Sequence, residues 1–266
     1  MKTRRKTTIN YLSNAELLHE LNLSKISYSS FLDEKFQDFS VIIDSENDIT
    51  PEVIYQAKEN KAIQLNRAKL RKMVKENWSK EDIKKDIDNN SYKPEDITED
   101  QLVYRIMTFD HVPEEFMTGK KNMMNVLRFP PFKHYAYIDG VFTEVGRSHW
   151  EGGLHNGKFN KDHGKATNNL AKAVMKITEN YSRKSNFSGY TYLDEMKSTA
   201  LMQLSVVLLQ FNEKISQNYF SYATQVVHTN FIKIIKAEKR QREIKDEIMQ
   251  SELGISSDAY RNKDRD

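Results

Sequence analysis

The chain has 266 residues, of which 38% are hydrophobic and 30% charged, and its formal net charge is +3. The absence of cysteine excludes a disulfide framework, a thiolate zinc site and a cysteine nucleophile. No apolar run approaches the ~20 residues that a membrane-spanning helix needs, and the basic N-terminus lacks the apolar segment of a signal peptide. We expect a soluble, intracellular protein of elongated, multi-part helical build.

Residues 1–29 predict a basic tail followed by a short helix. The tail reads MKTRRK, and Ser13 or Asn14 can cap the helix after it. A strand-like run, FSVIIDSENDIT, follows at residues 39–50.

A longer helix is predicted from Pro51 to about Asn77. Thr50 can cap it, proline suits its first position, and Glu52 suits its first turn. Residues 78–99 are polar and interrupted by proline, which indicates a linker or surface segment.

Between residues 129 and 150 the pattern changes to short strands. Alternating apolar residues flank Asp139-Gly140, the strongest short-range hairpin signal, so a hairpin is expected near residues 133–145. Residues 30–163 are therefore predicted to form a small inserted α+β module.

From residue 164 to residue 250 the pattern is helical again, and residues 251–266 read as a polar tail. One apolar stripe comprises Leu170, Val174, Ile177 and Tyr181. The predicted fold class is therefore mainly α, with the α+β module and its hairpin as an insertion.

Two amphipathic helices dominate the C-terminal part, and the first is apolar on two faces. Its expected core stripe is Leu193, Met196, Ala200, Leu204, Val207 and Phe211. The opposite side carries Glu195, Thr199, Met202, Val206 and Leu209. Such a helix is either covered by the rest of its own chain or docked on a partner.

The second helix pairs an apolar stripe with a polar and cationic one. The polar stripe falls within about 80° of arc at ~100° per residue and comprises Tyr222, Gln225, Thr229, Lys233, Lys236 and Arg240. Cations set register on phosphates, and short polar side chains reach base edges, so the stripe suits DNA. A solvated helix face is the alternative.

Several motifs in this order resemble region 2 of the sigma-70 family of transcription initiation factors. They are NYLSNAELL at 10–18, NFSGYT at 186–191, EMKSTALMQL at 195–204, Phe211, and Tyr222-Ala-Thr within 220–240. The closer resemblance is to the late-transcription sigma factors of T-even-type phages and their marine relatives. Residues 30–160 correspond to nothing in the short T-even form and resemble an insertion of the marine members.

The resemblance implies a role for each matched position. One helix face would dock on the clamp helices of the largest subunit of the host RNA polymerase core, through Glu195, Ser198, Thr199, Met202 and Ser205. Tyr222 would stack on the flipped base of the −10 promoter element, with Tyr219 and Phe220 nearby. Thr229 would face the upstream edge of that element, and Lys233 would lie close to it. Base extraction costs a few kcal/mol, which stacking on an aromatic ring can offset.

Two departures from the family pattern change the expected behaviour. Gln225-Val226 replaces the tandem tryptophan wedge of housekeeping sigma factors, so unaided promoter melting should be weaker. Residues 258–266 are charged, whereas the T-even members end in a hydrophobic segment that engages the sliding clamp. A phage co-activator and the sliding clamp are further candidate partners, and the expected location is the cytoplasm of the infected bacterium.

Other chemistries are less well supported. Four histidines lie between residues 134 and 163 without the convergent spacing of a metal site, and no cofactor is expected. Asp194 and Glu195 are adjacent on a helix and point ~100° apart, which disfavours a catalytic carboxylate pair. The remaining alternative of another class is a phage structural or scaffold protein, for which Tyr222, Gln225, Thr229 and Lys233 would be covered by the chain itself.

Overall fold

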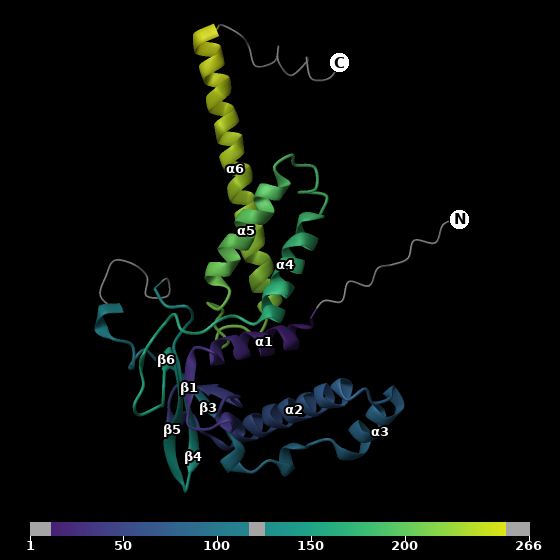
Figure 1. Cartoon of the computed structure of the whole chain (residues 1–266), viewed down its shortest axis with the longest axis vertical. Coiled ribbons are helices and arrows are strands. Elements are labelled where there is room, and N and C mark those ends of the chain that lie inside the picture. The colour runs from purple at the N-terminus through teal and green to yellow at the C-terminus, as the bar shows by residue number, and fades with distance from the viewer. Residues whose placement is uncertain (1–11, 117–125, 254–266) are drawn as a thin grey trace. The chain divides into compact units, whose positions relative to one another are not determined.

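The computed structural model describes residues 12–116 and 126–253, which form two compact units (Figure 1). We call residues 1–17, 168–208 and 218–266 the helical unit. Residues 18–167 and 209–217 form the sheet unit. The predicted module at 30–163 lies within the sheet unit, which also includes nine of the eleven residues that connect the two amphipathic helices. Each unit is described separately.

The sheet unit is built on a five-stranded mixed sheet in the order β1-β5-β4-β3-β2. The strands are β1 Ser29–Phe31, β2 Val41–Ile43, β3 Tyr104–Met107, β4 Phe132–Ile138 and β5 Val141–Ser148. Strands β2 and β3 are parallel, and the other pairs are antiparallel. A separate two-stranded ribbon joins β6 Trp150–Glu151 and β7 Lys158–Phe159.

The predicted hairpin is present as β4 and β5, but it forms the centre of the sheet. Asp139 and Gly140 have φ of 51° and 80°, as a two-residue hairpin turn of type I′ requires. The fold is α+β, with 55% of the described residues in helices, so the prediction of a mainly α fold with a small hairpin module was wrong. Strands β1, β2 and β3 have only three or four residues, too few to show a clear alternation in the sequence.

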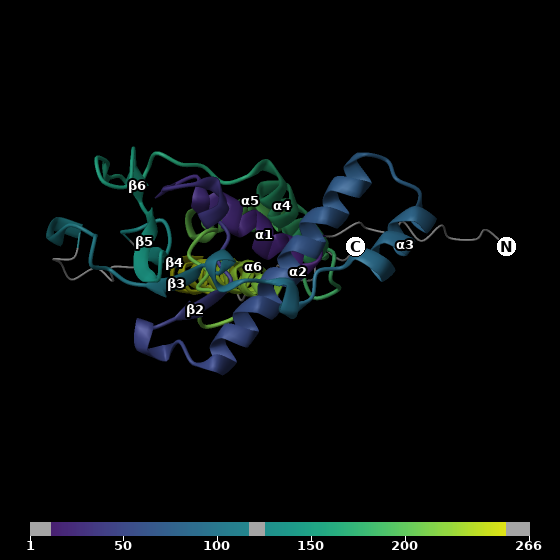
Figure 2. The same ribbon diagram turned by 90° about the horizontal axis from the view of Figure 1, so that it is seen from below.

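The predicted helix after Thr50 is confirmed as α2 Pro51–Lys75, with the Thr50 hydroxyl accepting a bond from the amide of Val53. Ala57 and Ala62 of α2 are buried against the sheet beside Tyr104. Residues 78–99 were predicted to be a linker or a surface segment. They contain a helix, α3 Lys80–Asn90, capped by Ser79 and without a buried residue, so the linker alternative was wrong and this helix lies at the surface. Figures 1 and 2 both show α3 beside the later half of α2. Short 3₁₀ helices are Glu34–Phe36, Glu46–Asp48, Pro94–Asp96, Glu99–Gln101 and Glu114–Phe116.

A fully buried arginine lies at the centre of the sheet unit. The Arg105 guanidinium lies 3.8 Å from the ring centroids of both Phe39 and Phe132. Its Nε donates to Nε2 of His134 (2.9 Å), and its Nη2 donates to Oδ1 of Asn22 (2.8 Å). Since Nε2 of His134 accepts, the imidazole is neutral and its Nδ1 donates to the Phe36 carbonyl at 2.8 Å.

A buried ion pair attaches residues 209–217 to this unit. Nζ of Lys25 donates to both carboxylate oxygens of Glu213 (2.8 and 2.7 Å) and to the Phe211 carbonyl (2.8 Å). Burial lowers the pKa of Lys25 to about 8 and that of Arg105 to about 10, against the opposing effect of Glu213. Burial alone would raise the pKa of Glu213, but these two cations hold it below its usual range.

The neutral state of His134 predicts acid sensitivity. Burial, with Arg105 beside the ring, holds the His134 pKa well below 6.5. The unfolded chain therefore takes up a proton first, and stability falls as pH drops below the unfolded value, by up to about 1.4 kcal/mol per pH unit. In His134→Gln, the side-chain amide can replace both hydrogen bonds of the imidazole but takes up no proton. Between about pH 6.5 and 5, the free energy of unfolding of this variant should therefore fall less steeply than that of wild type, by about 1.4 kcal/mol per pH unit. Urea unfolding followed by tryptophan fluorescence measures it, since Trp78 and Trp150 both belong to the sheet unit. If the free energy of unfolding depends equally on pH in wild type and in His134→Gln, the conclusion that His134 is neutral in the folded protein is wrong.

The helical unit consists of three helices and the start of α1 Asn14–Ile26. The three are α4 Asn168–Ser182, α5 Leu193–Val207 and α6 Tyr219–Leu253. Their buried residues meet in one core and include Leu170, Val174, Ile177, Met196, Ala200, Leu204, Ala223, Val227 and Phe231. The predicted apolar stripes are thus confirmed, except that Phe211 lies beyond α5 and is buried in the sheet unit.

Candidate nucleic-acid interface

The polar stripe of α6 lies on the side of the helix opposite its core residues. Gln225, Thr229, Lys233, Lys236 and Arg240 are all exposed, and Tyr222 is half-buried. The side chains are spaced three or four residues apart, so they form one line along the helix. Nε2 of Gln225 donates a hydrogen bond to the Thr229 hydroxyl at 3.4 Å. Among the described residues, this is the one side-chain hydrogen bond between two members of the line. We call these six residues the polar face of α6.

The charge of α6 rises along its length. Residues 233–245 contain six lysines and arginines and two glutamates, a net charge of +4. One of these cations, Lys239, pairs with Glu243 at 3.7 Å. The helix continues to Leu253, close to residue 250, where the predicted helical pattern ends. A helix of this kind presents a row of cations that attracts phosphate groups.

The two tyrosines at the start of α6 have a structural role. The Tyr219 hydroxyl donates to the Leu208 carbonyl (3.0 Å), and that of Tyr222 donates to the Val207 carbonyl (2.8 Å). These are carbonyls at the C-terminal end of α5, where intrahelical partners are lacking. Burial raises the pKa of Tyr222 to about 12 and raises that of Tyr219 further. Tyr219 is fully buried, so the structure does not place it on a DNA-facing surface. Tyr222 keeps part of its ring exposed.

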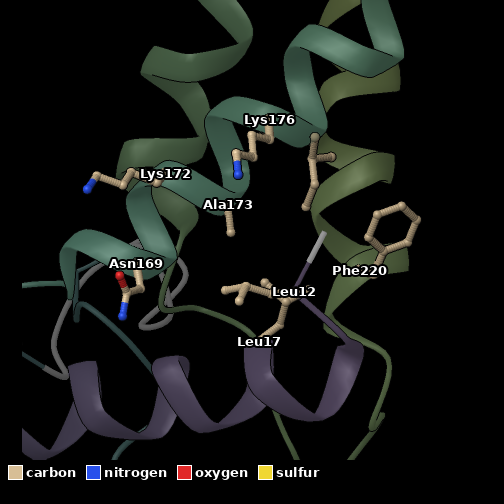
Figure 3. A pocket seen from close by; sticks show the side chains of 8 residues that line it. Leu12, Leu17, Asn169, Lys172, Ala173, Lys176 and Phe220 are labelled. Atoms are coloured by element: carbon tan, nitrogen blue, oxygen red, sulfur yellow. The ribbon is translucent and has the colours of Figure 1, made fainter. Parts of the chain in front are cut away.

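Phe220 belongs to a different surface from the polar face. It is two residues from Tyr222 and points about 160° away from it around the helix axis. Phe220 is 41% exposed and lines a mostly apolar pocket of about 130 Å³ in the helical unit (Figure 3). The other lining residues are Leu12 and Leu17 from the start of the chain and Asn169, Lys172, Ala173, Lys176 and Ile177 from α4.

Lys172 and Lys176 were missed by the sequence reading. Both are exposed on α4 and line the same pocket as Phe220, with Lys172 on the side away from it (Figure 3). Their spacing of four residues predicts that both lie on one face of α4. The helical period does not show which other element of the chain lies next to that face. The structure therefore brings together an aromatic ring and two cations that are more than forty residues apart in the sequence.

Most of the second face of α5 is exposed. Met202 and Val206 are 65% and 56% exposed. Glu195, Ser198 and Ser205 are exposed around them, and Thr199 is half-buried. The Ser198 and Ser205 hydroxyls donate to carbonyls of their own helix, Asp194 and Met202, at 2.8 and 2.7 Å. Leu209, assigned to this face from the sequence, lies beyond the helix end and is buried in the sheet unit.

The remaining site predictions concern absences and unplaced segments. Within residues 12–116 and 126–253, no group of three or more His, Asp or Glu is arranged to hold a metal ion. No helix in that part of the chain is both long and apolar enough to cross a membrane. Asn10 and Tyr11 of the N-terminal motif and residues 254–266 of the predicted tail lie outside the described residues. No family model, curated protein or solved structure matches the chain.

Proposed function

We propose that the chain is a sigma-factor-like subunit that directs late phage transcription by a bacterial RNA polymerase. It has no catalytic role of its own. It docks on the polymerase core through α5 and contacts a −10-like, A/T-rich promoter element through α6, in the cytoplasm of an infected bacterium. The observation that carries the proposal is the polar face of α6, five of whose six residues are exposed in one line.

The residue types on this face suit the two tasks of a promoter-reading helix. Lys233, Lys236 and Arg240 can neutralise phosphates and set the register of the helix on DNA. Thr229 and Gln225, one and two turns nearer the start of the helix than Lys233, are short enough to hydrogen-bond base edges. The half-buried ring of Tyr222 continues the same line, where an unpaired base can stack on it.

The exposed face of α5 supports a protein partner for the same unit. Exposed methionine and valine side chains in the middle of a face bordered by hydroxyls are typical of a protein-binding surface. Because the hydroxyls of Ser198 and Ser205 already donate within the helix, an apolar partner surface would bury few unsatisfied donors there. The helix can thus dock through Met202 and Val206 with Glu195 at one end.

Run-off transcription with purified bacterial core polymerase tests the proposal. The template carries an A/T-rich −10-like element, and core binding is measured separately. Wild type should bind core and initiate. Met202→Asp should weaken core binding by about 2 kcal/mol or more, since it places a charge in the centre of the docking face. Lys236→Glu should bind core normally and initiate poorly.

Two matched controls lie in the same unit. Met175→Asp makes the identical change at a methionine of α4 that is 56% exposed, outside the α5 face. Lys245→Glu makes the identical charge reversal on α6, on the other side of the helix from Lys236. Both control variants should behave as wild type. If wild type neither binds core nor initiates, the proposal is wrong and a structural role takes its place.

A further inference from the structure

An apolar groove runs between α2 and α3 in the sheet unit, apart from the surfaces discussed above. It encloses a pocket of about 220 Å³. The residues that line it are Ile63, Asn66, Arg67, Lys69, Leu70, Met73, Asp86, Ile87, Asn90 and Ser91. Figures 1 and 2 show α3 next to the later half of α2, which supplies the other lining residues.

The groove is bordered by aliphatic side chains that remain accessible. Ile63, Leu70 and Ile87 are 40%, 38% and 45% exposed, and Val74 extends the same strip at 60%. Ile63, Leu70 and Val74 are seven and four residues apart, so they lie on one side of α2. Four aliphatic side chains gathered at one groove form an exposed apolar strip of the kind that marks an interaction site.

Two polar side chains of the groove, Asn66 and Lys69, are already used within the unit. The Asn66 side chain accepts from the Tyr92 amide (2.8 Å) and donates to the Tyr92 carbonyl (3.0 Å). Lys69 pairs with Asp86 and donates to the Asn90 carbonyl at 3.0 Å. A ligand would therefore be held by apolar contact rather than by these groups.

One edge of the groove is cationic. Arg67, Arg71 and Lys75 follow one another at spacings of four along the side of α2 next to Leu70 and Val74, and all three are exposed. Nη1 of Arg71 is hydrogen-bonded to Nε2 of His19 at 2.9 Å. Between residues 61 and 75 the helix has six lysines and arginines and no acid. Among the described residues, neither Arg67 nor Lys75 has a carboxylate partner within ion-pair distance.

We propose that this groove binds an amphipathic helix of another protein, with its apolar side against Leu70 and Ile87 and acidic side chains against Arg67 and its neighbours. A nucleic acid would use the cations but leave the aliphatic strip exposed to water. The chain itself supplies no acidic match outside the described residues. Residues 1–11 and 117–125 contain lysine and arginine but no acid, and residues 254–266 have equal numbers of both signs. This inference does not depend on the proposed function.

The test uses the full chain and a fluorescein-labelled helical peptide of about 20 residues, long enough for five to six helical turns. Its leucines are spaced at three and four residues and its flanks carry glutamate. Comparison peptides have the same composition in scrambled order, or lysine in place of glutamate. Fluorescence anisotropy should show binding of the first peptide alone. Leu70→Asp and Arg67→Glu should each weaken it at least about tenfold.

Lys72→Glu is the matched control, because Lys72 is exposed on the same helix but on the side away from the groove. It should leave the affinity within about twofold of wild type, a change of under 1 kcal/mol. Equal loss for Lys72→Glu and Arg67→Glu, equal binding of the scrambled peptide, or displacement of the peptide by duplex DNA would overturn the proposal. So would a wild-type dimer in sedimentation velocity that Leu70→Asp converts to a monomer, because a second copy would then occupy the groove.

Discussion

Glu213→Ala is expected to cost the sheet unit about 3–5 kcal/mol of unfolding free energy, because it leaves two buried cations without their carboxylate. Lys25 and Arg105 are both fully buried, and Glu213 lies 2.7 Å from Nζ of the first and 3.7 Å from Nη1 of the second. Urea unfolding followed by tryptophan fluorescence at neutral pH measures the loss, since both tryptophans lie in this unit.

An exposed ion pair of the same segment provides the control. Lys214 pairs with Asp44, and both side chains are largely accessible to water. Asp44→Ala should therefore lower stability by less than about 1 kcal/mol. The double variant Lys25→Met, Glu213→Leu should recover only part of the loss: apolar residues of similar volume can replace the Lys25–Glu213 pair, but Arg105 stays buried without this carboxylate. A single-variant effect no larger than that of Asp44→Ala would show that residues 209–217 are not held by this pair.

Reversing the three cations of the polar face, with Lys233, Lys236 and Arg240 all replaced by glutamate, should weaken binding to A/T-rich promoter DNA on the order of 10²-fold or more. Each phosphate contact that is lost should also reduce the slope of log affinity against log salt by about one. Electrophoretic mobility shift of the polymerase complex at several salt concentrations measures both quantities.

A second triple variant has the same net charge and serves as the control. It distinguishes DNA binding at the polar face from attraction of DNA by the net charge of α6. Lys239, Arg242 and Lys245 lie on α6 outside the line of the polar face. Replacing these three with glutamate should change the affinity much less. If both triple variants lose the same affinity and the same salt slope, α6 attracts DNA by net charge alone and the polar face is not the contact surface.

The elements that the sequence predicts are those that depend on short-range signals. The Thr50-Pro51-Glu52 start of α2, the Ser79 cap of α3 and the Asp139-Gly140 turn act through the nearest backbone groups. Their structural consequences therefore do not depend on distant parts of the chain. The amphipathic stripes of α4, α5 and α6 are local in the same sense, since the helical period alone puts their members on one face.

The sequence by itself determined the helical stripes, the hairpin turn and which residues share a face of α5 or α6, because each depends on residues within a few positions of one another. The tertiary structure decided the rest. It joined three-residue strands from distant segments into one sheet and buried Arg105 between Phe39 and Phe132. It also directed the Tyr219 and Tyr222 hydroxyls to the end of α5 and placed Phe220 at the same pocket as Lys172 and Lys176. These contacts depend on which elements pack against one another. The free energy of long-range packing determines that arrangement, and no periodic pattern in the sequence reports it.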